Sequence, residues 1–217
     1  CVGDTVVFKD LGNGMGSAAI TWAWSLGNGD ISTVQNPKKQ FNDSGIITVS
    51  YYFFNALGCV SDTVSKQVTV DPYPHLVMGP NHKILEGGMV TIKPKFVYGT
   101  ALQYKWTPSL YLNSDTAATP VSAPLNDITY KLILTGKGGC SVTDTIFIEI
   151  LKAPEVANSF SPNGDGINES WRIKYMESYN GAAIDVYNRC GEVVFHSVGY
   201  DVNAEWSYKE KDLTVGT

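Results

Sequence analysis

The sequence predicts an all-β protein made of tandem β-sandwich modules, and three features of its 217 residues support this prediction. Apolar and polar residues alternate over stretches such as 20–26, 102–106 and 146–150, which is the period-two pattern of half-buried strands. Clusters of Gly, Pro, Asn and Asp separate these stretches, and helical periodicity is almost absent. The chain, which is 43% hydrophobic, is long enough to build the cores of two or three sandwiches.

A repeated segment indicates where the modules end. The run "NALGCVSDTVSKQVTV" at 55–70 is echoed by "TGKGGCSVTDTIFIEI" at 135–150. Each run has a Gly-Cys turn, a Ser/Asp/Thr step and an alternating strand, and Pro72 or Pro154 follows within a few residues. Two copies of the same module end are therefore predicted.

The repeats divide the chain into segments 1–71, 72–152 and 153–217, joined by short proline-containing linkers that we expect to be semi-rigid. Basic and acidic side chains number 4 and 6 in the first segment, 7 and 5 in the second, and 5 and 10 in the third. The net charge of −5 therefore comes from the last segment. This balance argues against a nucleic-acid partner, because phosphate binding needs a basic surface.

The four cysteines, at positions 1, 59, 140 and 190, are not spaced for zinc, because no CxxC pair or Cys/His cluster occurs. Cys1 precedes one strand-like run and Cys59 follows another, so we expect a Cys1–Cys59 disulfide that stabilises the fold by about 4 kcal/mol. Cys140 and Cys190 have no obvious partners, and a bridge between them stays open. This usage favours an oxidising compartment.

The ends of the chain and its hydropathy bear on where the protein resides. No run of 18 apolar residues occurs, so no transmembrane helix is expected. The chain opens with the strand-like "CVGDTVVF" instead of a signal peptide. We therefore expect this sequence to be a piece of a longer protein.

Catalytic signatures are missing, so we expect neither an enzyme nor a cofactor. His75, His82 and His196 lie in separate segments, and no Gly-x-Ser-x-Gly elbow occurs. The glycine-rich "GNGMGS" at 12–17 has Ser in place of the third glycine of a dinucleotide loop, and no helical pattern follows. In the aromatic run 51–54 only alternate side chains can face outward, so packing is expected, with binding of surface glycans as an alternative.

The first segment resembles the PKD domain. The run "WSLGNG" from Trp24 to Gly29 is followed by Asn36-Pro37, then Phe41 and Gly45 before a long strand. This order is the PKD hallmark, with Leu26 and Asn28 replacing the usual Phe and Asp. The resemblance covers about residues 1–71 and implies an immunoglobulin-like sandwich, in which we expect Trp24 to pack in the core.

The second segment looks like the immunoglobulin-like repeat of secreted bacterial surface proteins. Such repeats commonly have a cysteine where this chain has Glu86, and that cysteine pairs with the Gly-Cys turn. The replacement removes the partner that the resemblance implies for Cys140.

The third segment resembles the gliding-motility-associated C-terminal domain, the type B sorting domain of the type IX secretion system. Cys190 and Glu169 replace the Trp and Asp that this family usually carries, and the family continues beyond Val215–Thr217, so we expect the last module to be truncated. The residues that carry the resemblance are Phe160, Pro162, Asn163, Gly164, Asp165, Gly166, Asn168, Asn188, Arg189, Gly191 and Glu192, with Trp206 and Val215–Thr217.

Three interpretations of "SPNGDGINE" at 161–169 stay open. Asn-Gly and Asp-Gly favour a structural turn between strands. The same residues could form the surface that a secretion component reads. The third interpretation is a calcium loop with Asn163, Asp165 and Glu169 as ligands, which is weakened because Ser161 and Arg172 stand where carboxylates normally begin and end such a loop.

The resemblance implies a non-enzymatic function. We expect the C-terminal portion of a modular surface or secreted protein, an adhesin or a gliding-associated protein, that interacts with the type IX translocon or outer-membrane components. Two alternatives are a structural subunit that stays docked on that machinery and the tail of a secreted polysaccharide-degrading enzyme.

Overall fold

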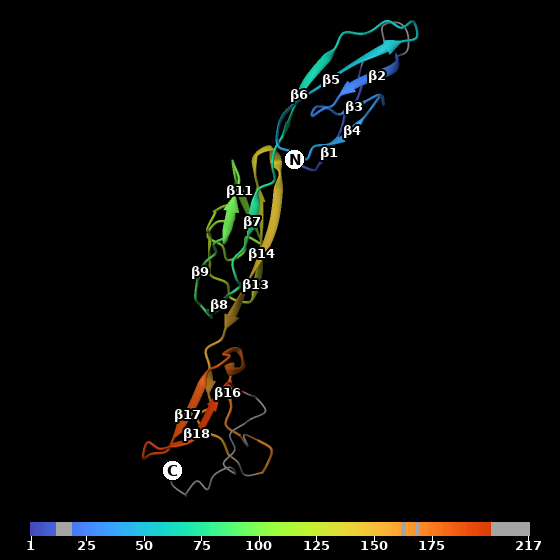
Figure 1. The fold of residues 1–217 in the computed structure, drawn as a ribbon. Helices are drawn as coiled ribbons and strands as arrows, with labels where there is room; N and C mark the ends of the chain where they lie inside the picture. The colour runs from blue at the N-terminus through green and yellow to red at the C-terminus, as the bar shows by residue number, and fades with distance from the viewer. Residues whose placement is uncertain (12–18, 162–163, 168–169, 201–217) are drawn as a thin grey trace. The chain divides into compact units, whose positions relative to one another are not determined.

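The structure is a computed structural model that describes residues 1–11, 19–161, 164–167 and 170–200 (Figure 1). All regular elements in these residues are strands apart from two short 3₁₀ turns, which confirms the predicted all-β class. The chain folds into two compact units. Unit 1 comprises Cys1–Pro80, Thr91–Ser122 and Thr129–Ile146, and unit 2 comprises Asn81–Val90, Ala123–Ile128 and Phe147–Thr217. The predicted segment boundaries near residues 71 and 152 stay predictions.

The first six strands belong to unit 1 and are called the first strand set. Four of them form an antiparallel sheet in the order β3-β2-β5-β6, and β1 pairs with β4. The turn between β5 and β6 lies at the end of this set opposite the N-terminus (Figure 1). The strands are β1 (Thr5–Val7), β2 (Ala19–Ser25), β3 (Ile31–Ser32), β4 (Lys38–Gln40), β5 (Gly45–Asn55) and β6 (Val64–Val70).

The core of the first strand set is built around Trp24, which is 5% exposed. Its ring stacks on Tyr51 at a centroid distance of 4.3 Å, and Leu26, Phe41 and Val49 are buried in the same cluster. Alternating residues of β2 and β5 thus supply the apolar layer, as expected from the period of two. The prediction that Trp24 packs in the core is confirmed.

The next eight strands are called the second strand set. Their main sheet has the order β11-β13-β14-β8, in which β8 runs parallel to β14, while β10 pairs with β7 and β12 with β9. A 3₁₀ turn, Lys137–Gly139, joins β13 to β14. The strands are β7 (His75–Val77), β8 (His82–Leu85), β9 (Val90–Thr91), β10 (Phe96–Tyr98), β11 (Gln103–Thr107), β12 (Val121–Ser122), β13 (Ile128–Thr135) and β14 (Ser141–Leu151).

The core of the second strand set is more completely buried than that of the first. Trp106 is 1% exposed and Tyr130 0%, and Leu132 and Leu134 on β13 are also fully buried. The Tyr130 hydroxyl donates to the carbonyl oxygen of Leu110 (2.7 Å) and lies 2.9 Å from Ser122 Oγ. These bonds satisfy the polar end of a side chain that is otherwise packed among apolar atoms.

The remaining strands, all in unit 2, are short and pair in twos. β15 (Glu155–Val156) pairs with β16 (Ile173–Lys174), and β17 (Ala183–Tyr187) pairs with β18 (Val193–Val198). A 3₁₀ turn spans Met176–Ser178. No described helix is long and apolar enough to cross a membrane.

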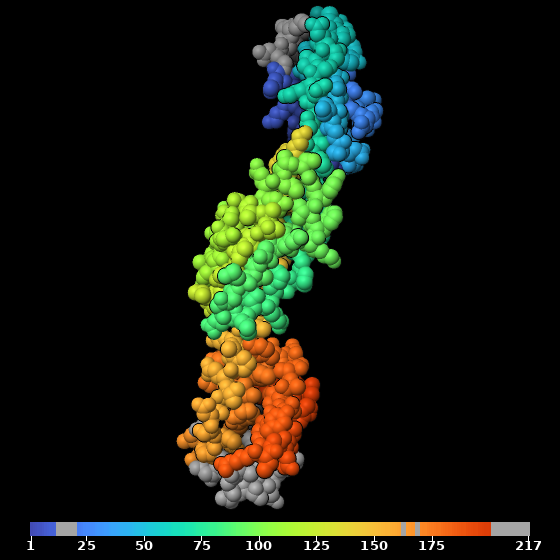
Figure 2. Space-filling model, turned by 90° about the vertical axis from the view of Figure 1, so that its left-hand side faces the viewer, coloured from blue at the N-terminus to red at the C-terminus, as the bar shows by residue number. Residues whose placement is uncertain are grey.

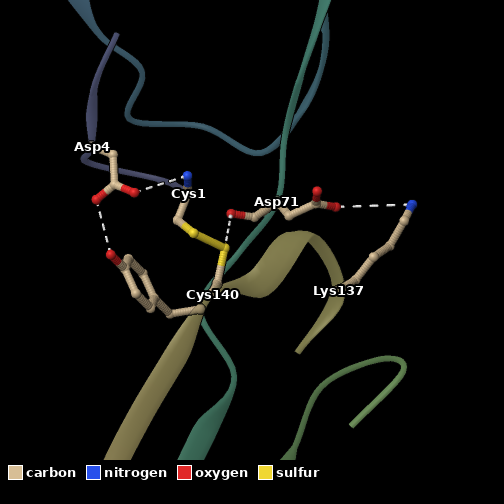
Figure 3. Close-up of a disulfide and its surroundings, with 6 residues drawn as sticks. Cys1, Asp4, Asp71, Lys137 and Cys140 are labelled. Atoms are coloured by element: carbon tan, nitrogen blue, oxygen red, sulfur yellow. Dashed lines mark hydrogen bonds and ion pairs between the residues drawn. A yellow bond between two sulfur atoms is a disulfide. The ribbon is translucent and has the colours of Figure 1, made fainter. Parts of the chain in front are cut away.

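The expected Cys1–Cys59 disulfide is wrong, because Cys1 is bonded to Cys140 with a Cα–Cα distance of 5.7 Å (Figure 3). The amide of Val2 donates to the carbonyl oxygen of Asp71, which holds Cys1 beside the end of β6. Cys59 lies beyond the other end of β6, and seven residues at about 3.3 Å each separate the two ends by about 20 Å. A disulfide requires Cα atoms within about 7 Å.

Candidate functional site

The residues singled out by the sequence in the third segment form two turns of unit 2. The first turn follows Phe160, which is half-buried, and contains Gly164, Asp165 and Gly166, all exposed. Gly164 and Gly166 have φ values of +79° and +83°, in the left-handed region that glycine adopts without strain. Pro162, Asn163, Asn168 and Glu169 lie outside the described residues.

Asp165 shapes the first turn. One oxygen of its carboxylate accepts a hydrogen bond from the amide of Ile167 at 2.7 Å, which is an Asx turn. The Ser161 hydroxyl donates to the carbonyl oxygen of Ile167 at 3.4 Å. These contacts support the structural-turn interpretation of this stretch.

The calcium interpretation stays a prediction. Two of its three expected ligands, Asn163 and Glu169, lie outside the described residues. Their distances to Asp165 are therefore not described either. In the part of the chain that the structure describes, no three His, Cys, Asp or Glu side chains are grouped so that they could hold a metal ion.

The second turn is organised by Asn188. Its Oδ1 accepts hydrogen bonds from the amides of Cys190 (2.9 Å) and Glu192 (3.0 Å), and its Nδ2 donates to Glu192 Oε2 (2.9 Å). Its backbone amide also donates to the carbonyl oxygen of Glu192, and Gly191 closes the turn at φ +83°. The structure thus brings Asn188 and Glu192 together and leaves Arg189 exposed at the tip.

This second turn joins β17 to β18, so the two strands fix its direction. Ile184 on β17 is buried, whereas Asp185 on the opposite face is exposed and pairs across the strands with His196 (Nδ1–Oδ1 2.6 Å). The register shifts between Val186 and Tyr187, immediately before the turn, which is a bulge-type irregularity. The arrangement presents a polar, internally hydrogen-bonded tip on a two-stranded ribbon.

The start of this region is anchored by contacts that no sequence motif indicates. The Tyr179 hydroxyl donates to the carbonyl oxygen of Lys152 (2.8 Å), and the Lys152 ammonium lies 5.1 Å from the centre of the Tyr175 ring. Lys174 forms an ion pair with Glu155 at 3.2 Å, in register across β15 and β16. The signal that could have revealed this ion pair was the opposite charge at paired positions of two short strands.

The histidines predicted to be unrelated lie in different environments. His75 contacts the ring of Phe96 at 5.1 Å, His82 begins β8, and His196 pairs with Asp185. Cys59 and Cys190 are exposed free thiols. These placements bring no described histidine beside a cysteine, and the expectation of a non-enzymatic protein stays a prediction.

Comparison with known families identifies the region that contains both turns. Residues 154–217 match the family model of the CHU_C Type IX secretion signal domain. The domain indicates export to the cell surface or secretion, and it implies interaction with the secretion machinery. No curated protein matches the chain.

Several solved structures have a similar arrangement of strands at low identity. Drosophila OTK extracellular domains 3–5 are 12% identical, with a TM-score of 0.33 and coverage of 71% of this chain and 62% of that one. The fibronectin(III)-like modules of Clostridium thermocellum CbhA are 10% identical, with a TM-score of 0.36 and coverage of 70% and 88%. The Bacteroides ovatus mixed-linkage glucan utilization locus SGBP-B, solved with a mixed-linkage heptasaccharide, is 14% identical, with a TM-score of 0.21 and coverage of 83% and 50%.

Proposed function

We propose that this chain is the C-terminal portion of a modular bacterial surface protein, an adhesin or a gliding-associated protein, without catalytic activity of its own. The secretion signal of residues 154–217 directs export, and the strand sets ahead of it hold a functional region away from the membrane. The observation that carries this proposal is the match of the family to the segment that contains both turns.

The chemistry of the strand sets supports a spacer role. The interiors of their described parts are mainly apolar, with Trp24 and Trp106 at the centres, and the buried hydroxyl of Ser122 lies 2.9 Å from that of Tyr130. Among the described residues, no three His, Cys, Asp or Glu side chains are grouped as a metal site would require. A packed sandwich of this kind holds the segments at its two ends apart, which is what a spacer requires.

The Asn188–Glu192 turn supplies the recognition surface in this proposal. Its shape is fixed by hydrogen bonds within the turn, so binding to a secretion component requires little ordering of the backbone. Arg189 projects from the tip in a segment whose net charge is negative. A local cation on an acidic domain gives a partner a defined point of contact.

The test is export of a reporter. A fluorescent protein is placed ahead of Cys1 in the native polypeptide, including its natural C-terminus, and expressed in a bacterium that has a type IX secretion system. We expect the reporter on the cell surface or in the medium, and we expect it to stay in the periplasm when the polypeptide is cut before residue 154. Periplasmic retention of the complete fusion would contradict the proposal.

The same cells separate the proposed surface protein from a docked subunit of the machinery. A surface protein is shaved from intact cells by protease and does not co-purify in fixed ratio with translocon components. Constant stoichiometry with outer-membrane translocon components, without surface display, would overturn the surface-protein assignment.

A further inference from the structure

Two turns of unit 1 share a pair of backbone hydrogen bonds, and each contains a cysteine. In the turn after β13 the amide of Gly136 donates to the carbonyl oxygen of Cys140 (2.8 Å), and that of Gly139 donates to Gly136 O (3.2 Å). In the turn after β5 the amide of Asn55 donates to the carbonyl oxygen of Cys59 (3.1 Å), and that of Gly58 donates to Asn55 O (3.0 Å).

The glycine before each cysteine also matches, whereas the residue before that glycine differs, because Gly138 has a φ of +72° and its counterpart Leu57 has no positive φ. Gly139 has a φ of +80° and Gly58 a φ of +78°. Each turn joins two neighbouring strands of a four-stranded sheet, and both turns belong to the repeated segment. Cys59 and Cys140 are therefore equivalent positions of two successive strand sets.

The two cysteines differ in what covers them. Cys140 is 1% exposed, because Cys1 of the preceding strand set is bonded to it and the carbonyl oxygen of Asp71 lies 3.5 Å from its sulfur (Figure 3). The fit is close, since a Cβ on Gly138 would lie 2.3 Å from Asp71 Oδ2. The bridge therefore joins the start of one strand set to the Gly-Cys turn of the next.

Cys59 stands in a turn with the same backbone hydrogen bonds, and no strand set among the described residues covers it. It is an exposed free thiol, and its neighbours Leu57 and Val60 are 82% and 57% exposed. Figure 2 shows the end of the first strand set around β5 and β6, in cyan and teal, reaching the surface. The thiol and its two apolar neighbours are therefore accessible to a partner.

We propose that Cys59 forms the equivalent bridge with a further sandwich module, whose opening cysteine occupies the place that Cys1 takes at Cys140. The turn at Cys59 has Leu57 at the position of Gly138. The partner module therefore presents an apolar residue at the position that Asp71 takes against Gly138. Formation of the bond removes two protons and two electrons from the two thiols. The electrons reduce a disulfide donor, such as oxidised glutathione, to two thiols.

The test supplies that module. Because Cys59 and Cys140 are 81 positions apart, a copy of residues 1–81 placed ahead of the whole chain puts the copy's first cysteine 139 residues before Cys59, the separation of Cys1 and Cys140. In both fusions the copy carries Asp71→Ala, which supplies the apolar residue opposite Leu57, and the second fusion also carries Cys59→Ser in the copy only. Both are folded with oxidised and reduced glutathione, and disulfides are mapped by mass spectrometry without reduction.

We expect a peptide that joins the copy's first cysteine to Cys59, together with the Cys1–Cys140 bridge. The two Cys1 peptides are distinguishable, because only the original one is preceded by Asn81 in the fusion. Cys190 is the matched control, since it is also an exposed free thiol and should still be alkylated. In the unfused chain Cys59 and Cys190 should react alike.

Two results would overturn the proposal. One is alkylation of Cys59 to the same extent as Cys190 in both fusions. The other is a bond from the copy's first cysteine to Cys190, or from Cys59 to Cys1, in place of the expected bridge. Either result shows that the matching turn geometry does not specify a partner.

Discussion

Two tryptophans of this protein make the same hydrogen bond in very different surroundings. Trp106 of the second strand set donates from Nε1 to the carbonyl oxygen of Ala117 at 2.9 Å, and Trp171 of the secretion signal domain donates to Ala157 O at 2.8 Å. Trp106 is 1% exposed, whereas Trp171 is half-buried. The same polar contact thus serves a packed core in one region and a surface loop in the other.

This difference extends to the residues around each tryptophan. Leu132, Leu134 and Ile146 of the second strand set are at most 1% exposed, whereas Ile173 and Ile184 are the buried hydrophobic residues among 154–161, 164–167 and 170–200, at 6% and 9%. The described part of the signal domain therefore depends more on hydrogen-bonded turns than on a fully buried core.

Truncation of the two tryptophans gives the largest expected difference. Trp106→Ala should lower the free energy of unfolding of its strand set by about 3–5 kcal/mol, because a large cavity is left in a packed core. Trp171→Ala should cost clearly less, since its side chain is partly in contact with solvent. Hydrogen exchange measured on peptides from 92–151 and from 154–200 reports the two regions separately. Equal losses would show that the two regions depend on their tryptophans to the same extent.

Tyr130 tests whether polar contacts matter in the packed region. Tyr130→Phe removes the hydroxyl between Leu110 O and Ser122 Oγ, and the buried acceptor left unpaired should cost about 1–3 kcal/mol. In the double variant with Ser122→Ala the loss should be smaller than the sum of the single losses, as for any pair in contact. Additive losses, measured by urea unfolding, would show that the pair does not act together.

The same residue gives a dependence on alkaline pH. Burial raises the pKa of the Tyr130 hydroxyl above its usual value, although the hydrogen bond with Ser122 acts in the opposite direction. The neutral form is therefore favoured in the folded state. This stabilisation is complete below the pKa of an unfolded tyrosine and is lost as the pH rises through the folded pKa. Tyr130→Phe should flatten the melting temperature over this alkaline range, and an unchanged slope would contradict the assignment.

Sequence reasoning succeeded where a local pattern fixes the structure. Alternation predicted the strands, and the Trp24 and Asn-Gly run predicted the first core, because period and turn chemistry are properties of neighbouring residues. The disulfide could not be predicted in this way. Pairing of Cys1 with Cys140 depends on where Val2 meets Asp71, a contact between residues 69 positions apart that no local pattern encodes.

The secretion signal illustrates the same limit. Asn188, Gly191 and Glu192 were singled out only by a family resemblance and no turn was predicted there, although Asn followed by Gly three residues later favours a turn. The anchors at Lys152, Tyr175 and Tyr179 carry no motif, because any donor or ring at the right distance could serve. Such contacts depend on the fold, so they cannot be predicted before the fold is known.

The signal domain should respond to loss of its turn more than to loss of its tip. Asn188→Ala removes three side-chain hydrogen bonds and should raise hydrogen exchange of the β17–β18 turn, with a loss of about 1–2 kcal/mol in its local stability. Arg189→Ala changes no described hydrogen bond of the turn and should leave exchange unchanged while reducing export. If Arg189→Ala exports normally, the tip is not the recognised surface.

The smallest effect on stability is expected at the surface of the second strand set. The Lys105 ammonium, which hydrogen-bonds to Asp115, holds the pKa of that carboxyl below its usual value, although partial desolvation opposes the shift. The contribution of this pair is present above the pKa of an unfolded aspartate and is lost as the pH falls through the lower folded pKa. Lys105→Met should therefore reduce the melting temperature slightly at neutral pH and not in strong acid, with high salt giving the same reduction in the unmodified chain. A large effect of this substitution would mean that the second strand set relies on its surface as well as on its core. The second strand set would then differ less from the signal domain than its buried residues indicate.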